Sequence, residues 1–560
     1  MANILGRLRS EIRRRRVVHA LWPVIMLSGG IAFAGEGSTT QTEGGGVVSV
    51  ATSLILQAEG LPLTLHDVAY LALLNNREIK IERLTSRIAE QEIRREGAVF
   101  HPIYSLESST SNSQSASGTA LAGISTPQAE SVNWSSSLKA KLLSGAVASL
   151  DFINSKTDGN SEFLTLNPQY SSSLAFTLTQ PLLKDFGPRI NTIKIKVATN
   201  TLGISRYQLQ SKVANILTDV ENTYWDLVLA FKDMEIRRRA LQLTHQLAQR
   251  TKELVDEGLL PETANLQARV SVVQREGDVL VAENALRDTL SRLKELLNLG
   301  PGADLPILPL DQPTLETKNI DIPQAVKDAL RRRPEIPQVK LDLENKNLTL
   351  DFAKNQQLPQ LNLFGSYGWS GLAGTPTGPQ SFKISVPIFR GRSLTFNIST
   401  PILTTGPNLD GGYGTSLENL FSGDFPAWKV GMNLTIPLGN VAAKSLLTRA
   451  ELDRQKSELT LQNVETAIVL EVERAANQVQ TALKLIDVAK ALKDQTQRRL
   501  DMIQEQFDLG LASMSAVVEA QRDLAAAERE EIKSLVDYNK LLAVFGRATG
   551  ITLEKYRVDL

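Results

Sequence analysis

The residues that could carry out chemistry in this chain are few, and they exclude most kinds of enzyme site. Cysteine is absent, and the only four histidines, His19, His66, His101 and His245, lie far apart in the sequence. Disulfides, thiolate metal sites and cysteine nucleophiles are therefore excluded, and a histidine metal cage is not expected. No Walker sequence, His-x-x-x-His motif or Ser/His/Asp order occurs. We predict no enzyme activity, no cofactor and no metal site.

The remaining candidates are carboxylates beside two similar glycine bends. Asp256 and Asp508 precede Gly258 and Gly510 by two residues, and Glu519 follows the second glycine by nine. Such carboxylates, gathered in one oligomer, would repel one another and attract cations. The plainer interpretation of each is a solvated carboxylate at a helix end, because acidic residues are common on surfaces.

Apolar residues follow the same two bends. Leu259 and Leu260 come directly after the first glycine, and Leu511 and Met514 follow the second. These four residues and the two glycines are candidate docking contacts for a partner protein. Packing that caps a coiled coil is the alternative.

Charge and hydropathy restrict the class of protein. The 61 Lys and Arg balance 61 Asp and Glu, so the chain lacks the basic excess of a nucleic-acid binder. Beyond the N-terminal region no run of 18 apolar residues occurs, so we expect no transmembrane helix in the mature protein. Any insertion into a membrane would then use a β-barrel.

The N-terminus has the pattern of an export signal. Arg13–Arg16 form a basic region, an apolar stretch follows over 17–31, and Ala32-Phe33-Ala34 fits a cleavage site. We therefore predict a signal peptide at 1–34 and a flexible leader at 35–61, which is rich in Gly, Ser and Thr. A retained amphipathic anchor is the alternative.

The elements that must position the glycine bends occur twice. Proline and glycine landmarks recur in the same order at a separation of 252 to 257 residues: Pro102 and Pro359, Pro181 and Pro437, Gly258 and Gly510. We predict a first repeat at 62–300, a proline-rich linker at 301–321, a second repeat at 322–550 and a tail at 551–560.

Each predicted repeat has the same order of elements. A helical stretch (66–98; 323–356) precedes a strand region (about 99–186; 357–440). A long helix (189–256; 441–508) and a returning helix (262–299; 514–548) then form a hairpin of about 189–299 in the first repeat and 441–548 in the second.

The strand regions alternate between apolar and polar residues. Leu174, Phe176 and Leu178 share one face, as do Val430 and Met432, which is the pattern of strands in a lipid-embedded barrel. Further segments at 138–142, 146–150, 382–389 and 394–399 are interpreted as extended extracellular loops or hairpins, with additional barrel strands as the alternative.

The long helices predict an oligomer. Leu461, Val464, Ile468, Val472, Ala475, Val479, Ala482, Ile486 and Ala489 follow coiled-coil spacing. A helix of that length, about 100 Å, can be matched by two short helices stacked end to end, the returning helix of one repeat and the leading helix of the other. The few strands of one chain cannot close a barrel, so the sequence predicts a ring-shaped homo-oligomer.

Taken together, these motifs resemble the TolC-like outer-membrane efflux protein family over about 62–555. The resemblance rests on Leu65…Ala72-Leu73…Asn76…Glu78, on Leu178-Thr-Gln-Pro-Leu182, and on the glycine-centred hairpins followed by Ala268 and Ala520. The absence of a lipid-anchoring cysteine matches the unacylated members.

The resemblance implies an α+β membrane protein: a trimeric outer-membrane β-barrel, four strands per chain, continuous with a long periplasmic α-helical barrel. It implies a non-catalytic exit duct of a tripartite efflux pump or type I secretion system, with a periplasmic adaptor and an inner-membrane transporter as partners. In the family, acidic rings close the duct; Glu519 falls on one such position, and Ala264 and Ala516 occupy another.

Two other functions fit part of the pattern. A barrel-anchored coiled-coil surface or structural protein would explain the helices but not their repetition as hairpins. An adaptor subunit also has helical hairpins, but no lipoyl-like β-module is visible in the sequence. The sequence does not specify the cargo.

Overall fold

The computed structural model describes residues 61–116, 124, 126–161, 164–300, 307–315, 320–377, 381–388, 392–399 and 408–558. Contacts divide the chain into two units, Met1–Glu59 and Gly60–Leu560, and the second unit is the subject below. The predicted signal peptide, the leader up to residue 60, and linker residues 301–306 and 316–319 lie outside the described residues.

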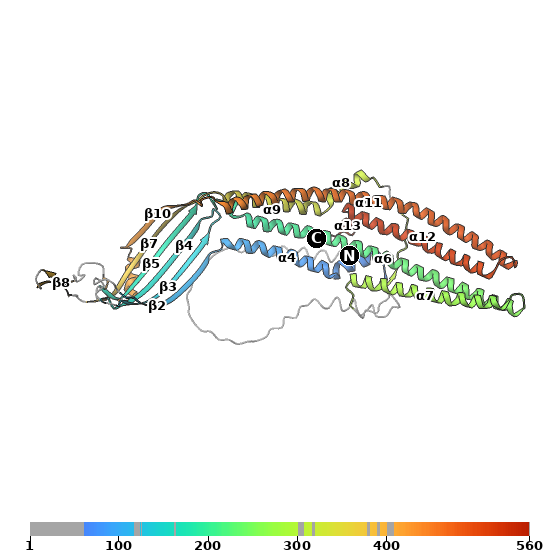
Figure 1. The fold of residues 1–560 in the computed structure, drawn as a ribbon, viewed down its shortest axis with the longest axis horizontal. Helices are drawn as coiled ribbons and strands as arrows, with labels where there is room; N and C mark the ends of the chain where they lie inside the picture. Colours follow the sequence, from blue (N-terminus) through green and yellow to red (C-terminus); the bar gives the residue numbers. More distant parts are fainter. Residues whose placement is uncertain are drawn as a thin grey trace, which may run out of the picture. The chain divides into compact units, whose positions relative to one another are not determined.

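Two long helices, α6 (Ile193–Asp256) and α11 (Val441–Asp508), organise the helical part of this unit. Each packs along two shorter helices that follow one another end to end (Figure 1). The partners of α6 are α4 (Arg77–Gly97) and α7 (Glu262–Leu296), and those of α11 are α9 (Glu335–Gln356) and α12 (Met514–Thr549). Two short helices do line each long helix, but the two partners of α11 both come from its own repeat rather than one from each repeat, and α6 also packs against α9 and α12.

The first helical stretch of each predicted repeat is not continuous, which corrects the prediction. The segment 66–98 is broken at Asn76, between α3 (Leu65–Asn75) and α4. The segment 323–356 is broken after α8 (Ile322–Arg332), before Pro334. The Asn76 side chain accepts hydrogen bonds from the backbone N–H groups of residues 78 and 79, and so caps a new helix. Pro334 lacks the N–H that a continuous helix needs.

The core runs along the seams between these helices. On α6, Val213, Leu217, Val220 and Leu227 are buried against α3, the end of α7 and the two-stranded sheet of β1 (Leu61–Leu63) and β6 (Ile307–Pro309). The predicted seam of α11 is confirmed from its third position on, because these residues are buried: Ile468, Val472, Ala475, Val479, Ala482, Ile486 and Ala489. A last short helix, α13 (Thr552–Lys555), packs on α6.

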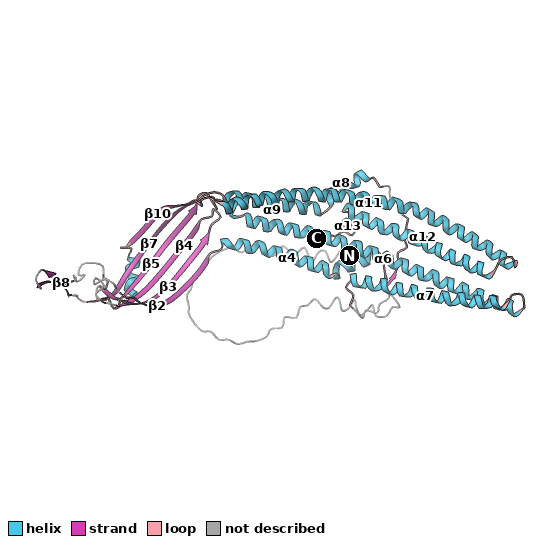
Figure 2. Ribbon diagram, viewed as in Figure 1, coloured by secondary structure: helices cyan, strands magenta, loops and turns pink. Residues whose placement is uncertain are grey.

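An antiparallel sheet of six strands, in the order β10-β7-β5-β4-β3-β2, joins the helical part (Figure 2). The strands are β2 (Ile103–Gln114), β3 (Gln128–Lys141), β4 (Val147–Gly159), β5 (Leu166–Pro181), β7 (Gln360–Pro376) and β10 (Pro426–Thr435). Within the described residues β2 and β10 each pair on one side only, so the sheet of a single chain is open.

Two of the segments interpreted as extracellular loops are strands instead. Residues 138–141 end β3 and residues 147–150 begin β4. Their turn lies at the helical end of the sheet, because the Ser144 hydroxyl donates to Gln180 at 2.9 Å and the Ser144 carbonyl accepts from Gly187. The sheet therefore has six strands rather than the four that the resemblance implied. In the second half, β8 (Ser381–Ile388) and β9 (Arg392–Ser399) form a separate hairpin, as predicted.

The six-stranded sheet has two chemically different faces. Successive residues of a strand alternate between faces, and residues paired across an antiparallel ladder share one. Leu150, Phe176, Tyr367 and Trp428 are paired in register and exposed, and they define the apolar face. The opposite, polar face is rich in hydroxyl groups: Ser105, Ser109, Ser131, Ser135, Ser137, Ser149, Ser155, Ser171, Ser173, Ser366 and Ser370.

A short helix, α10 (Tyr413–Ser422), lies against β5 and β7. Its first residues, Tyr413 and Gly414, belong to the glycine-rich stretch 411–414. Among the helices of the described part of the chain, none is both long and apolar enough to cross a bilayer.

Candidate functional site

The two glycine bends have the same backbone geometry. Gly258 and Gly510 have φ of +77° and +75°, in the left-handed region that glycine adopts without strain. The N–H groups of Gly258 and Leu259 donate to the carbonyls of residues 255 and 254, and those of Gly510 and Leu511 donate to residues 507 and 506. These bonds satisfy the last carbonyls of α6 and α11, so each glycine ends one helix and allows the chain to return.

The tips present apolar side chains to solvent. Leu259 is 68% exposed and Leu511 is 76% exposed. Leu260 is partly buried. Met514 differs from the other docking candidates because it is 5% exposed and packs with Leu247, Ala268 and Val517. Met514 therefore supports the tips from inside, whereas Leu259 and Leu511 remain available to a partner.

The three candidate gate carboxylates have different surroundings. Asp508 forms an ion pair of 3.1 Å with Arg250, which joins α11 to α6. Asp256 is exposed and has no ion-pair partner within the described residues. Glu519 is also exposed, one turn of α12 beyond Met514. The structure thus balances the charge of Asp508 and leaves that of Asp256 uncompensated.

A groove of about 1000 Å³ runs between α7 and α12 above the tips. Glu519 and Met514 line it, together with Leu266, Val270 and Val281 of α7, which are more than half exposed. The sequence reasoning named only residues at the bends and missed these three. Leu266, Val270, Val273 and Leu280 are spaced as a second apolar stripe on α7, and that spacing was the available signal.

An ionic cluster fastens the two hairpins together above this groove. Asp233 of α6 is buried and forms ion pairs with Arg237 at 3.0 Å and with Arg529 of α12 at 2.9 Å. Arg237 also approaches Asp278 of α7, which pairs with Arg275. Because three helices contribute to the cluster, it fixes the hairpins at this level.

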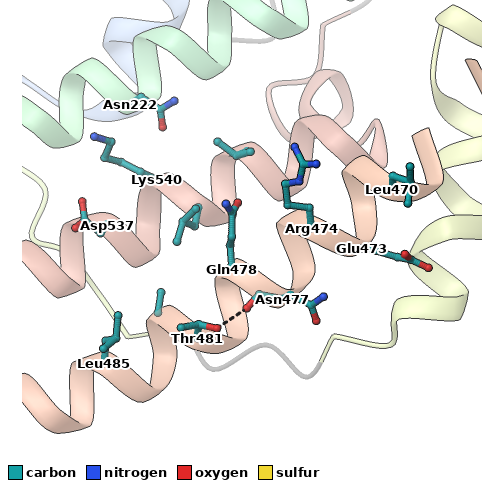
Figure 3. Close-up of a pocket in the computed structure, with 13 residues that line it drawn as sticks. Asn222, Leu470, Glu473, Arg474, Asn477, Gln478, Thr481, Leu485, Asp537 and Lys540 are labelled. Carbon is teal, nitrogen blue, oxygen red and sulfur yellow. Dashed lines mark hydrogen bonds between the residues drawn. The ribbon is translucent and has the colours of Figure 1, made fainter. Parts of the chain in front are cut away.

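A second pocket, of about 800 Å³, opens between α6, α11 and α12 (Figure 3). Leu470 and Leu485 of α11 line it and are more than half exposed. Asn222 and Lys540, from α6 and α12, lie on the same side of the close-up, while Thr481 turns back to donate to the Asn477 carbonyl at 2.9 Å. The lining combines apolar side chains with charged groups such as Glu473, Arg474 and Lys540.

No group of three or more metal-binding side chains occurs in the part of the chain that the structure describes. The residues singled out by sequence lie at the two helical tips, and two of them, Met514 and Glu519, also line the groove between α7 and α12.

Comparison with known proteins relates this arrangement to channels. Residues 325–543 match the family model described as outer membrane efflux protein. A curated relative, "Nodulation protein T" of Rhizobium leguminosarum bv. trifolii, is 21% identical over 340 residues, which is 58% of this chain and 62% of the relative. The match thus spans less than two thirds of that protein.

Solved structures share the fold. The outer-membrane channel OprN has a TM-score of 0.61 at 15% identity, covering 87% of this chain and 89% of OprN. The CmeC outer membrane channel of Campylobacter jejuni has a TM-score of 0.60 at 16% identity, covering 96% and 94%. The open-state MtrE channel of Neisseria gonorrhoeae has a TM-score of 0.58 at 16% identity, covering 87% and 89%.

The fold is that of outer-membrane channels. Residues 325–543 of this helix-rich chain match the outer membrane efflux protein family, and the chain resides in the outer membrane, from which it extends into the periplasm.

Proposed function

We propose that this protein is the exit duct of a tripartite efflux pump or a type I secretion system, which carries substrates from an inner-membrane transporter across the periplasm to the exterior. The observation that carries this proposal is the two-faced sheet: one face is exposed and apolar, the other is rich in serine, and both edges are unpaired within the described chain. An apolar outer face suits lipid, and a polar inner face suits a water-filled pore.

The working form is a homotrimer in this proposal. Open sheet edges are not tolerated in lipid, so β10 of one copy must pair with β2 of the next. The helices also have unpartnered apolar stripes. On α11 the exposed residues Leu452, Leu459, Leu470, Leu485, Val488 and Leu492 lie close to whole helical turns apart. The facing stripes are Ile81, Leu84 and Ile88 on α4 and Leu266, Val270, Val273 and Leu280 on α7.

These stripes match in extent. Because α4 and α7 follow one another along α6, together they can cover the whole stripe of α11 from a neighbouring copy. The pocket in Figure 3 lies on this face of α11 and would be filled by that neighbour. The internal duplication into 62–300 and 322–550, linked by 301–321, supplies the paired hairpins that this ring needs.

A periplasmic adaptor would dock on the exposed tip residues Leu259 and Leu511. Asp256, Asp508 and Glu519 are proposed to form the acidic constriction that the adaptor opens.

Planar-bilayer recording tests the duct directly. The purified protein, extracted in detergent, is expected to insert as an oligomer and to give cation-selective channels of low conductance. Val488→Glu places a charge in the proposed contact between copies and should abolish oligomers, whereas Glu465→Gln, on the same helix, should not. A Val488→Glu protein that still forms channels like the unaltered protein would contradict the trimer interface.

Protease treatment of whole cells separates the duct from a coiled-coil surface protein. A duct keeps its helices in the periplasm, so cleavage should be confined to loops near 115–130 and 370–425. Loss of α6 or α11 from intact cells would overturn the proposal.

A further inference from the structure

The short helix α10 packs on the apolar face of the sheet. Ser416 Oγ lies 3.0 Å from Ser172 Oγ and 3.1 Å from the carbonyl oxygen of Gly371. Ser172 occupies the same face of β5 as Leu174 and Phe176, because the three alternate along one strand. The helix therefore lies on the side of the sheet that faces lipid in the proposed duct.

The backbone of α10 lies very close to the backbone of β7, which fixes the position of this helix. A Cβ on Gly371 would lie 2.0 Å from the carbonyl oxygen of Ser416 and 2.5 Å from the backbone nitrogen of Leu420. Both Ser416 and Leu420 are buried against the sheet. Only glycine at 371 permits this contact, so α10 is fitted to its position rather than being a loose loop.

The helix covers a row of paired polar residues on the apolar face. Asn154 is paired in register between Trp134 and Ser172, and it is 1% exposed. Trp134 contacts Tyr413 at the start of α10, with ring centroids 5.8 Å apart. Both amide atoms of Asn154 lack hydrogen-bond partners in the described structure. Without α10, an amide and a hydroxyl would face hydrocarbon, which is unfavourable.

The height of this row of residues along the strands explains why it must be covered. On β7 the apolar face runs from Leu361 to Trp369, about 26 Å along the strand at a rise of about 3.3 Å per residue. With a strand tilt near 40° this corresponds to about 20 Å of membrane depth, whereas barrel proteins present an apolar band of about 25 Å. The next row of paired residues on this face, which contains Gly371, Ser172 and Asn154, extends the apolar band to about that height.

The exposed side of α10 changes along the helix from a charged residue to an apolar one. The chain enters α10 beside Gly374, to whose carbonyl Gly411 donates at 3.1 Å, and leaves it beside Ser370, which donates to Phe425. The helix therefore descends along β7 toward the apolar band. Phe421, near its lower end, is 70% exposed, and Glu418 is exposed one turn nearer the cell exterior.

We propose that α10 is a membrane-interface helix that completes the hydrophobic band of the duct: it covers Asn154 and Ser172, inserts Phe421 among the acyl chains of the outer leaflet, and holds Glu418 at headgroup level. This inference rests on the proposed function, because it requires the apolar face of the sheet to contact lipid. Lipid is the partner because α10 adjoins the exposed apolar residues of the same face.

Spin labels placed one at a time test this inference, and the chain needs no prior removal of cysteine because it has none. Phe421→Cys, Glu418→Cys, Val430→Cys and Lys429→Cys are labelled with a nitroxide and reconstituted in phosphatidylcholine vesicles. Collision with oxygen, which concentrates in hydrocarbon, is compared with collision with a water-soluble nickel complex. Val430 and Lys429 are adjacent residues on the apolar and polar faces and calibrate the two extremes.

We expect the ratio of oxygen to nickel collisions at 421 to approach that at 430, and to exceed that at 418 several-fold. A ratio at 421 as low as at 418 or 429, with lipid contact at 430, would overturn the assignment of α10 alone. Water contact at 430 would overturn the membrane placement itself.

A second variant tests the seat of the helix. Gly371→Leu should displace α10 and remove the lipid contact at 421. Gly365→Leu is the matched control, because a Cβ at 365 meets nothing nearer than 3.9 Å. Unchanged lipid contact at 421 in the Gly371→Leu protein would contradict the seating of α10 on β7.

Discussion

Arg250 of α6 and Asp508 of α11 form an ion pair of 3.1 Å that joins the two hairpins beside their bends. Both side chains are about half exposed, so the pair adds little to the stability of the fold. Its effect is instead on the relative position of the tips, because it is the ion pair nearest to Gly510 in the described chain. In the proposed duct, a weak ion pair of this kind would favour the closed arrangement of the tips but would still allow them to separate.

Breaking this link should open the proposed duct. Arg250→Gln is expected to raise single-channel conductance several-fold, because the tips separate more readily. The increase should be smaller at high salt, where the unaltered pair is already screened. Arg287→Gln, which removes a surface partner of Glu283 on α7, is the matched control and should leave conductance unchanged. Equal conductance in the Arg250→Gln and unaltered proteins would show that the pair does not restrain the tips.

Asp256 is expected to set ion selectivity more strongly than Asp508. The two carboxylates occupy equivalent positions before the glycine bends, but only that of Asp508 is balanced by a nearby arginine. Asp256→Asn should therefore reduce the preference for cations more than Asp508→Asn does. Reversal potentials measured across a salt gradient give the comparison. A larger effect of Asp508→Asn would refute this ranking.

The left-handed glycines should be sensitive to any side chain. Gly510→Ala is expected to destabilise its hairpin by about 1 kcal/mol, because an L-residue is strained at φ of +75°. Nothing lies within 4 Å of a Cβ at 510, so the cost is one of backbone conformation and not of crowding. Gly277→Ala is the control: it also has open space around it but is helical, so alanine there should stabilise. Thermal unfolding of both variants checks the opposite signs.

The helical part of this fold was largely predictable from sequence. The α11 helix begins and ends at the predicted residues 441 and 508, since a long seam of alanines and β-branched residues has no competing periodicity. The breaks at Asn76 and Pro334 were missed because the apolar pattern continues across them. The side-chain cap of Asn76 and the missing N–H of Pro334 each outweigh that pattern over a single residue.

The sheet was less predictable. The segments that form parts of β3 and β4 alternate in the manner of strands, but their place in the main sheet depends on long-range pairing that local pattern does not specify. The helix α10 begins with glycines that favour a loop, and its contact with Gly371 decides its conformation. At the tips, sequence located the bends and the carboxylates. It did not show that Met514 is buried or that Arg250 pairs with Asp508, because both facts depend on the neighbouring hairpin.

A partly buried ionic network around Arg333 should make the helical part sensitive to acid. Glu335, at the start of α9, is bonded to Arg333 at 3.0 Å and to the hydroxyl of Ser211 at 3.2 Å. Burial acts to raise the pKa of Glu335, but the hydrogen bonds and charge of Arg333 outweigh it and hold that pKa below its ordinary value. Arg333 also pairs with Glu471, which Arg547 contacts at 2.6 Å.

Because the pKa of Glu335 is lower in the folded than in the unfolded chain, its contribution to stability is complete above the unfolded value. It is lost as the pH falls from about 4.3, the ordinary value for Glu, through the folded pKa. Glu335→Gln should therefore lower the melting temperature at pH 7 but have little effect at the acid end of this window. Melting curves of both proteins between pH 7 and pH 3 make the comparison. A melting-temperature difference that stays constant across this range would show that the pairing of Glu335 with Arg333 does not underlie the acid sensitivity.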